Sequence, residues 1–396
     1  MKNNLRLYLF ALSLVIYEFT TYAANDMIMP GMLMVVKEFN SPVSYVALSL
    51  SMYLFGNALL QLFLGPLSER FSKRTVIIGG NILFLVFTVF IAASNNMDMF
   101  LLGRLLQGAG IAFVAMGYAL IHENFDDKNS VRIIALMGNI TVLAPIIGPF
   151  IGGAIIGYAS WRYVFIFSLI TGLISLYGLI KYTPPNKTPL QKLNLSEVMQ
   201  HYYDIFIMPK FLVGVLAIGF LVMPSMLWIA ISPTLVMHTL KLSMHHYMYY
   251  QAIAIGGFLL STIINQIAAG KINMLKLISL GAYLSIVGFV VIAVFHTNIL
   301  WIAIGFCISC TGLGLQLGTM FRILGKLEVK SQSLLFSLMA FIQIIIMAVV
   351  LESSNNILKY FDYSLLSFVV SCLVLGIISM LFVFRFISMN KNRNWQ

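Results

Sequence analysis

Long apolar segments separated by short polar ones run along the whole 396-residue chain. A helix that crosses the hydrocarbon core of a membrane needs about 20 mostly apolar residues. The pattern predicts about twelve such spans, at residues 7–34, 43–67, 75–94, 99–121, 130–157, 162–181, 211–237, 247–269, 275–296, 299–321, 332–354 and 363–387. The predicted fold class is therefore an all-α membrane protein.

One polar stretch, at about residues 183–205, is much longer than the others and separates two sets of six spans. Within it, Asn194 and Glu197 have the spacing of a capping box, which predicts a short helix at the inner membrane surface. Two six-span halves joined in this way are typical of large two-bundle transporters. We therefore expect an N-terminal six-helix bundle over 1–182, a cytoplasmic linker with an interfacial helix over 183–209, and a C-terminal six-helix bundle over 210–396.

The charged residues indicate the class of protein and its orientation. Only 9% of the chain is charged, whereas a soluble domain carries about 25%, so soluble folding is excluded. With the N-terminus placed inside the cell, 19 of the 24 Lys and Arg residues fall in inner segments. The positive-inside rule then predicts that both termini are cytoplasmic. Topology also explains the net charge of +11, so no nucleic-acid partner is expected.

The first predicted span contains two acids, in the stretch "YEFTTYAANDMIMPGM". Glu18 and Asp26 are eight residues apart, which corresponds to about 12 Å along a helix and about 80° around it. Ionisable residues inside a membrane are costly and usually functional. Since burial disfavours the charged form of a carboxyl group, both acids are candidates for taking up a proton on one side and releasing it on the other. The alternative is a structural ion-pair network.

Arg104 lies within the fourth predicted span, in "LLGRLLQGAG". An arginine at this depth needs a partner or a water-filled surrounding. Asp26 lies at about the same depth, so Arg104 is expected to favour its ionised form and help its proton leave. The alternative is an arginine whose side chain extends outward to the interface.

Two further segments have unusual backbone chemistry. The second span ends in "GPLSERFSKR", where a glycine and a proline precede an acid and a basic cluster. The fifth span contains "APIIGPFIGG", whose prolines and glycines permit a bent helix and close helix approach. We expect gating or conformational roles for Gly65, Glu69, Arg70, Lys73, Arg74, Pro145, Gly148, Pro149 and Gly152. The alternatives are a purely topogenic basic loop and generic small-residue packing.

Three of these segments resemble signatures of the major facilitator superfamily. "GPLSERFSKR" resembles the signature of its loop between the second and third helices, with Glu69 where Asp is usual and Ser72 where Gly is usual. Arg104, Gln107 and Gly108 resemble its R-x-x-Q-G signature. "APIIGPFIGG" resembles its antiporter motif, with alanine in place of the first glycine. The resemblance implies the major facilitator fold, and it implies that the acid in the inner loop acts as a latch at the N-terminus of a facing helix.

The first span also resembles that of the MdfA-type multidrug/proton antiporters, and the resemblance extends through "GYALIHENF" and "ALMGNITVLAP". It implies a proton-coupled multidrug exporter of the bacterial inner membrane, which works by alternating access around a cavity between the two bundles. Glu18, Asp26 and Arg104 would couple protons. We expect a monomer whose partners are drugs, protons and membrane lipids, and we expect substrate contacts from Tyr22, Asn25, Tyr118, Met137 and Trp228.

Other functions remain open at this stage. A dedicated exporter of one metabolite, such as a siderophore or a peptide-like product, would use the same mechanism, and a nutrient symporter would share the fold. An enzyme is not expected, because no span end carries a nucleophile–base pair or a metal cluster. An ATP-driven pump would need a phosphate-binding G-x-x-x-x-G-K-[ST] segment, which the sequence lacks. No metal or cofactor is expected either, since Cys307 and Cys310 fit a packing role best.

Overall fold

The computed structural model describes residues 2–185, 195–268 and 271–391, and these residues form helices joined by turns. The helices of the first half are α1 (Lys2–Met27), the 3-10 helix η1 (Met29–Gly31), α2 (Met32–Glu38), α3 (Tyr45–Arg70), α4 (Lys73–Ala92), α5 (Met97–Ala112), α6 (Val114–Asn124), α7 (Asp127–Tyr158) and α8 (Arg162–Tyr182). Those of the second half are α9 (Leu195–Phe206), α10 (Pro209–Pro233), the π-helix η2 (Thr234–Thr239), α11 (Met244–Ala268), α12 (Met274–Val294), α13 (Ile299–Leu324), α14 (Gln332–Tyr360) and α15 (Leu365–Asn390).

The number of spans agrees with the sequence pattern. Among the described residues, 11 helical segments are long and apolar enough to cross a membrane, and α7 makes a twelfth if it counts as one bent span. Its two parts, Lys128–Ile140 and Leu143–Tyr158, meet at an angle of 48°, close to Pro145. The expected all-α architecture of about twelve spans is confirmed.

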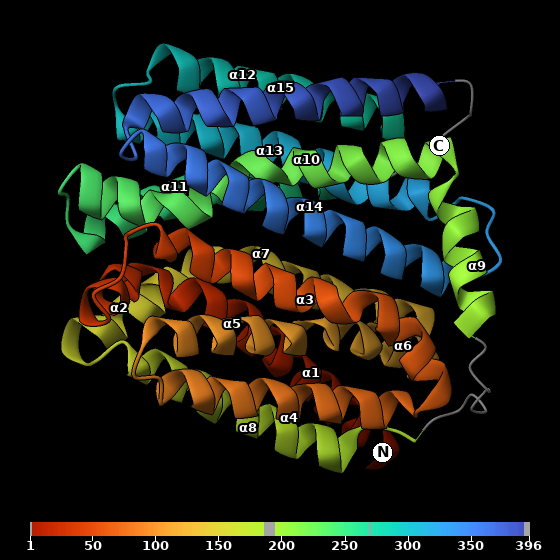
Figure 1. The fold of residues 1–396 in the computed structure, drawn as a ribbon. Coiled ribbons are helices and arrows are strands. Elements are labelled where there is room, and N and C mark those ends of the chain that lie inside the picture. Colours follow the sequence, from red (N-terminus) through yellow and green to blue (C-terminus); the bar gives the residue numbers. More distant parts are fainter. Residues whose placement is uncertain (1, 186–194, 269–270, 392–396) are drawn as a thin grey trace. The chain divides into compact units, whose positions relative to one another are not determined.

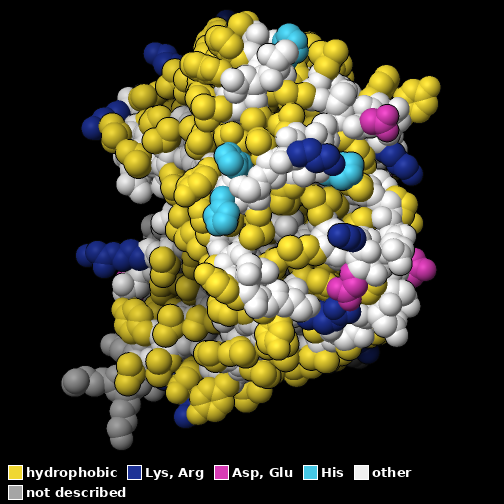
Figure 2. Space-filling model, turned by 90° about the vertical axis from the view of Figure 1, so that its left-hand side faces the viewer, with side chains coloured by type: hydrophobic (Ala, Val, Ile, Leu, Met, Phe, Trp, Pro, Cys, Tyr) yellow, Lys and Arg dark blue, Asp and Glu magenta, His cyan; other side chains and the backbone are white. Residues whose placement is uncertain are grey.

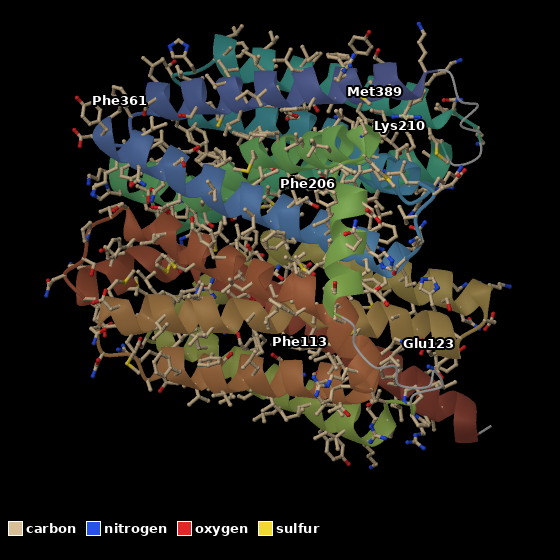
Figure 3. All side chains as sticks on the ribbon, turned by 45° about the vertical axis from the view of Figure 1, so that its right-hand side comes forward. Phe113, Glu123, Phe206, Lys210, Phe361 and Met389 are labelled. Atoms are coloured by element: carbon tan, nitrogen blue, oxygen red, sulfur yellow. The ribbon has the colours of Figure 1, made fainter. Side chains whose placement is uncertain are left out.

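The chain divides into two compact units, Met1–Val198 and Met199–Gln396. The division falls within the polar stretch that was expected to link two bundles. The short helix predicted there corresponds to α9, although its predicted cap, Asn194, lies outside the described residues. Phe206 and Lys210 flank the junction between α9 and α10 (Figure 3).

The two units repeat the same pattern of helix neighbours. In the first, α1 packs against α7 and α8, α3 against α5, and α4 against α5 and α8. In the second, α10 packs against α14 and α15, α11 against α13, and α12 against α13 and α15. Within each unit the axes of the long helices are roughly aligned, and consecutive spans run in opposite directions (Figure 1). The repeat is thus visible in the packing, although the sequence shows no strong internal repeat.

Glycines permit the closest helix contacts in both units. A Cβ atom on Gly56 would lie 1.7 Å from the carbonyl oxygen of Leu105, and one on Gly257 would lie 1.9 Å from that of Cys307. Between α12 and α13 the fit is reciprocal, since both helices carry the pattern G-x-x-x-S-x-x-G, in "GAYLSIVG" and "GFCISCTG". The first glycine of each pattern faces the last glycine of the other. Small residues of this kind let membrane helices pack through their backbones.

Two spans of the first unit are interrupted. Pro30 has no backbone N–H, so the first span changes from α-helix to the 3-10 helix η1 just beyond Asp26. The fourth span breaks at Phe113, between α5 and α6 (Figure 3). The Phe113 ring packs onto Gly80 of α4. The first span of the second unit is irregular near the corresponding end, because α10 passes into η2 after Pro233.

Figure 2 views the protein from the helix ends on the left of Figure 1, where Lys, Arg, Asp, Glu and His side chains lie among apolar ones. The surface along the sides of the helices is apolar. Large exposed apolar residues occur on most of the long helices, for example Leu59, Phe63, Tyr177 and Ile263. Side chains of this type are stable against lipid tails and unfavourable against water. The surface therefore belongs to a multi-pass membrane protein.

Candidate functional site

Helix α1 carries the two acids into the interior of the first unit. The exposed fraction is 1% for Glu18 and 5% for Asp26, and Arg104 of α5 is 0% exposed. Charged groups buried to this degree require hydrogen-bond partners. The hydrogen-bond partners described below come from α1, α3, α5 and α6 of the same unit.

Arg104 uses each of its three nitrogens. Its Nε donates to the Ser49 hydroxyl at 3.3 Å, its Nη1 donates to Gln107 Oε1 at 2.9 Å, and its Nη2 donates to Asn25 Oδ1. The guanidinium also lies over the ring of Tyr53, 4.2 Å from the centroid. Such a planar set of donors is specific to arginine.

Asn25 stands between the guanidinium and the carboxylate. Its side-chain oxygen accepts from Arg104, and its amide nitrogen donates to Asp26 Oδ1 at 3.4 Å. Among the described residues the ion pairs within 4 Å are Lys73–Glu123 and Arg162–Glu38. The neutral amide of Asn25 therefore bridges Arg104 and Asp26. The sequence did not predict this geometry.

Glu18 has a separate environment. Its Oε1 accepts a hydrogen bond of 2.7 Å from the hydroxyl of Tyr118 on α6. The structure thus joins an expected proton-coupling residue with an expected substrate contact. Tyr22, one turn along α1 from Glu18, is half-buried.

The surrounding packing fixes α1 in place. Tyr53 donates to the carbonyl of Thr21 at 2.6 Å, and Tyr17 donates to that of Gly110 at 2.6 Å. On the other side, a Cβ on Gly148 of α7 would lie 2.8 Å from Asp26 Cβ, and one on Gly152 would lie 1.8 Å from the carbonyl oxygen of Met27. The glycines of the fifth span therefore bring α7 directly against the acid.

Two other expected substrate contacts lie in apolar cores. Met137 is fully buried in a hydrophobic cluster that includes Phe10 and Leu14. Trp228 belongs to the second unit, where its ring packs against Phe306 and Phe368 at centroid distances of 5.0 and 6.1 Å. In this structure both residues pack within their own units.

The basic hairpin between the second and third spans is tied to the ends of two other helices. Lys73 pairs with Glu123 at the end of α6, and Arg74 Nη2 donates to the carbonyl of Ile180 near the end of α8 at 2.6 Å. Figure 3 shows Glu123 at this end of the unit.

The other expected hairpin residues make fewer described contacts. Arg70 is exposed, and its guanidinium lies 5.6 Å from the ring centroid of Phe71. Gly65 and Glu69 belong to α3, but beyond this placement they lie outside the described residues.

Several contacts of the candidate site were not predicted from the sequence. Glu123 was not selected, although it follows the fourth span at the end expected to meet the basic hairpin. Thr88 was also missed: its hydroxyl accepts from Gln107 Nε2 at 2.8 Å and extends the Arg104 network to α4. The i, i+3 spacing of Arg104 and Gln107 was the available signal, since it places both on one helix face.

Fold and site together define a class: a multi-pass helical membrane protein with two repeated units and a buried carboxylate–amide–guanidinium cluster on its first span. The family description "Major Facilitator Superfamily" matches residues 14–350. The chain belongs to the Major Facilitator Superfamily, a superfamily of transporters, so it is a transporter and not an enzyme.

Curated relatives confirm the resemblance to MdfA-type transporters. The multidrug transporter MdfA of Yersinia pestis bv. Antiqua (strain Angola) is 36% identical over 324 residues, which cover 80% of this chain and 79% of the relative. The protein of the same name from Escherichia coli O6:H1 (strain CFT073) is 33% identical over 354 residues, which cover 88% of this chain and 86% of the relative.

Two solved structures share the fold at low sequence identity. The crystal structure of a D-xylose–proton symporter matches with a TM-score of 0.77 and 16% identity, over 96% of this chain and 98% of that chain. A bacterial homologue of the human lysosomal transporter Spinster, inward-facing and unoccupied, matches with a TM-score of 0.73 and 14% identity, over 99% of this chain and 98% of that chain. The expected major facilitator fold is confirmed.

Proposed function

We propose that the chain is a proton-coupled multidrug efflux antiporter of the bacterial inner membrane, with both termini in the cytoplasm. It exports lipophilic cations and neutral compounds by alternating access, as a monomer surrounded by membrane lipids. The names of the curated relatives support multidrug transport. The observation that carries the proton coupling is the buried series Asp26–Asn25–Arg104.

In this proposal Asp26 is the group that gains and loses the transported proton. An ionised Asp26 is stabilised by the Asn25 amide, which the permanent charge of Arg104 holds in place. A protonated Asp26 no longer needs the amide donor and can pack as a neutral group against Gly148 of α7. Protonation would thereby change the contact between α1 and α7.

Substrate and proton would compete on α1. Glu18, Tyr22 and Tyr118 offer a carboxylate and two aromatic rings, a combination that suits a lipophilic cation. Binding of substrate there would favour release of the proton, and protons entering from outside would reset the site. One elementary charge moved across 100 mV supplies about 2.3 kcal/mol, which is enough to drive export against a useful gradient.

The inner hairpin would hold one conformation of the first unit. Lys73 and Arg74 attach the start of α4 to the ends of α6 and α8. These contacts, together with the latch proposed for Glu69, would have to rearrange when access changes sides. The Lys73 and Arg74 contacts do not involve Glu18 or Asp26, so they would affect transport without contributing to drug binding.

Substrate-induced proton release from the purified protein tests this function. The probe is tetraphenylphosphonium, a permanent lipophilic cation, followed by a panel of cationic and neutral drugs. Wild type should release protons on binding, Asp26→Asn should abolish the release, and Glu18→Gln should weaken cation binding more than neutral-drug binding. Asp98→Asn, at an exposed acid of the first unit, is the matched control and should behave as wild type.

Normal release and normal cation transport in both Asp26→Asn and Glu18→Gln would refute proton coupling by these acids. The same panel separates multidrug export from the alternative of a dedicated exporter. Competition among chemically unrelated drugs supports the former, whereas a response to one compound class alone supports the latter.

A further inference from the structure

A second polar pair lies on α3, apart from the charged cluster. Gln61 Nε2 donates to Asn57 Oδ1 at 3.0 Å, one helical turn away. The exposed fractions are 8% for Asn57 and 9% for Gln61. Leu59 and Phe63, on the opposite side of the same helix, are more than half exposed. The two amides therefore point away from the lipid-facing surface.

The pair has unused hydrogen-bonding capacity. In the described part of the chain, the Asn57 amide nitrogen and the Gln61 amide oxygen make no further hydrogen bond, and neither is a fully enclosed atom. Buried amides in a membrane protein normally satisfy both ends. Asn81 differs in that its amide nitrogen donates to Ser175 Oγ at 3.1 Å between two helices, while its enclosed Oδ1 has no hydrogen-bond partner in the described residues. Within the described chain, Asn57 and Gln61 hydrogen-bond only to each other along α3. The Asn57 amide nitrogen can therefore still donate a hydrogen bond, and the Gln61 amide oxygen can still accept one.

The position of the pair connects it to the site. Tyr53, one turn before Asn57, lies under Arg104 and bonds to the carbonyl of Thr21 on α1. From that contact Asn57 lies about 6 Å further along α3. Glu18 lies about 4.5 Å from Thr21 along α1, and α1 and α3 run in opposite directions. Asn57 and Glu18 are thus at about the same depth in the unit.

We propose that Asn57 and Gln61 form a subsite for uncharged polar groups of the transported molecule, such as an amide or a hydroxyl. Asn57 supplies N–H donors and Gln61 supplies a carbonyl acceptor, which together match a group that both donates and accepts. The subsite carries no charge, so it gives no advantage to a cation. The subsite rests on the proposed multidrug function. In this assignment neutral substrates bind Asn57 and Gln61, and cationic substrates bind Glu18.

Equilibrium binding to the purified full chain tests the assignment with two probes. Thiamphenicol is uncharged and carries an amide and hydroxyls, and tetraphenylphosphonium is a cation without hydrogen-bonding groups. The double variant Asn57→Leu/Gln61→Met should bind thiamphenicol about five- to tenfold more weakly, since one or two hydrogen bonds are lost. Its affinity for tetraphenylphosphonium should stay within about twofold of wild type. Equal weakening of both probes, or of neither, would overturn the subsite.

Two further variants keep the test decisive if the double variant is unstable. Asn57→Gln/Gln61→Asn retains both amides and should bind thiamphenicol within about threefold of wild type. Asn57→Asp adds a charge and should strengthen tetraphenylphosphonium binding while weakening that of thiamphenicol; the opposite order would refute the subsite. Asn81→Leu, a buried amide remote from the pair's free groups, is the control for general loss of packing and should not change the ratio of the two affinities.

The proposed function and the subsite fail in different ways. If wild type binds neither probe and releases no protons, multidrug transport itself is wrong. If wild type binds both probes with proton release and the α3 variants leave their ratio unchanged, only the subsite is wrong.

Discussion

Arg104 shows how one side chain can organise several helices. It reaches α1 through Asn25, α3 through Ser49 and its own helix through Gln107. A lysine would keep the charge but offer a single nitrogen in place of three. Arg104→Lys should therefore lower the free energy of unfolding by about 1.5–3 kcal/mol and reduce transport at least tenfold. Thermal unfolding in detergent and drug efflux from cells measure the two effects.

Arg162→Lys is the matched control for this substitution. Arg162 pairs with Glu38 at 2.7 Å, but the two side chains are 30% and 42% exposed. Exposed ion pairs contribute only about 0–1 kcal/mol, so this variant should remain close to wild type. A similar loss of stability in both variants would show that the depth of Arg104 has no special effect.

Asn25 links the two charged groups, so its removal should separate stability from coupling. In Asn25→Leu, Arg104 loses an acceptor and Asp26 loses a donor, although both charged residues remain. We expect substrate-induced proton release to fall at least tenfold, with drug binding within about threefold of wild type. Titrated proton release together with equilibrium binding tests this. Unchanged release in a folded Asn25→Leu protein would mean that Asp26 and Arg104 do not act through the amide.

The sequence indicated which residues of the cluster mattered but not how they meet. An arginine and two acids within apolar spans stand out because each is costly there. The role of Asn25 depends on the rotation of α1 relative to α5, and the approach of Gly148 to Asp26 depends on the register of α7. Rotation and register are set by packing between helices, which no local pattern reports.

Glycine positions on α7 give a test of helix packing within a single element. A Cβ on Gly152 would lie 1.8 Å from the backbone oxygen of Met27, whereas one on Gly157 would have no atom within 4 Å. Gly152→Ala should force α7 away from α1 and lower the free energy of unfolding by about 2 kcal/mol or more. Gly157→Ala should be neutral or slightly stabilising, since alanine favours helix by up to about 1 kcal/mol. Thermal unfolding of both variants compares them, and equal effects would contradict the packing of α7 on α1.

Span positions were predictable because hydropathy and length fix them locally. The interruption of the first span could have been inferred from Pro30, which follows Asp26 closely. The break at Phe113 could not, because neither proline nor glycine occupies that residue. At this break the ring of Phe113 packs onto Gly80 of α4. The sequence around Phe113 or around Gly80 does not by itself indicate that the two residues meet.

Across the whole chain, the repeated architecture carries different chemistry in its two units. Leu105 and Cys307 occupy equivalent places, each meeting a glycine of the neighbouring helix. The preceding residue is Arg104 in the first unit and Phe306 in the second, where it packs against Trp228. A buried charged cluster thus corresponds to an aromatic one.

The orientation of the chain can be tested with single cysteines. Lys241 and Lys326 are both exposed, and the positive-inside rule places them on opposite sides of the membrane. A membrane-impermeant maleimide should label Lys241→Cys in intact cells, and it should label Lys326→Cys only after permeabilisation. The native cysteines are buried or half-buried and serve as the background control. The reverse labelling pattern would invert the topology.

The chain separation within the buried cluster has a consequence for biogenesis. Asn25 and Arg104 are 79 residues apart, and Glu18 and Tyr118 are 100 apart. During synthesis the first span, with its two carboxyl groups, therefore enters the membrane before Arg104 and Tyr118, which bind Asn25 and Glu18, have been made. A charge left in hydrocarbon costs about 2.5–3.5 kcal/mol on the insertion scale. The polar groups of the first span gain these hydrogen bonds only when the fourth span is inserted. Nascent chains arrested before residue 104 should therefore be the ones most readily degraded by membrane proteases.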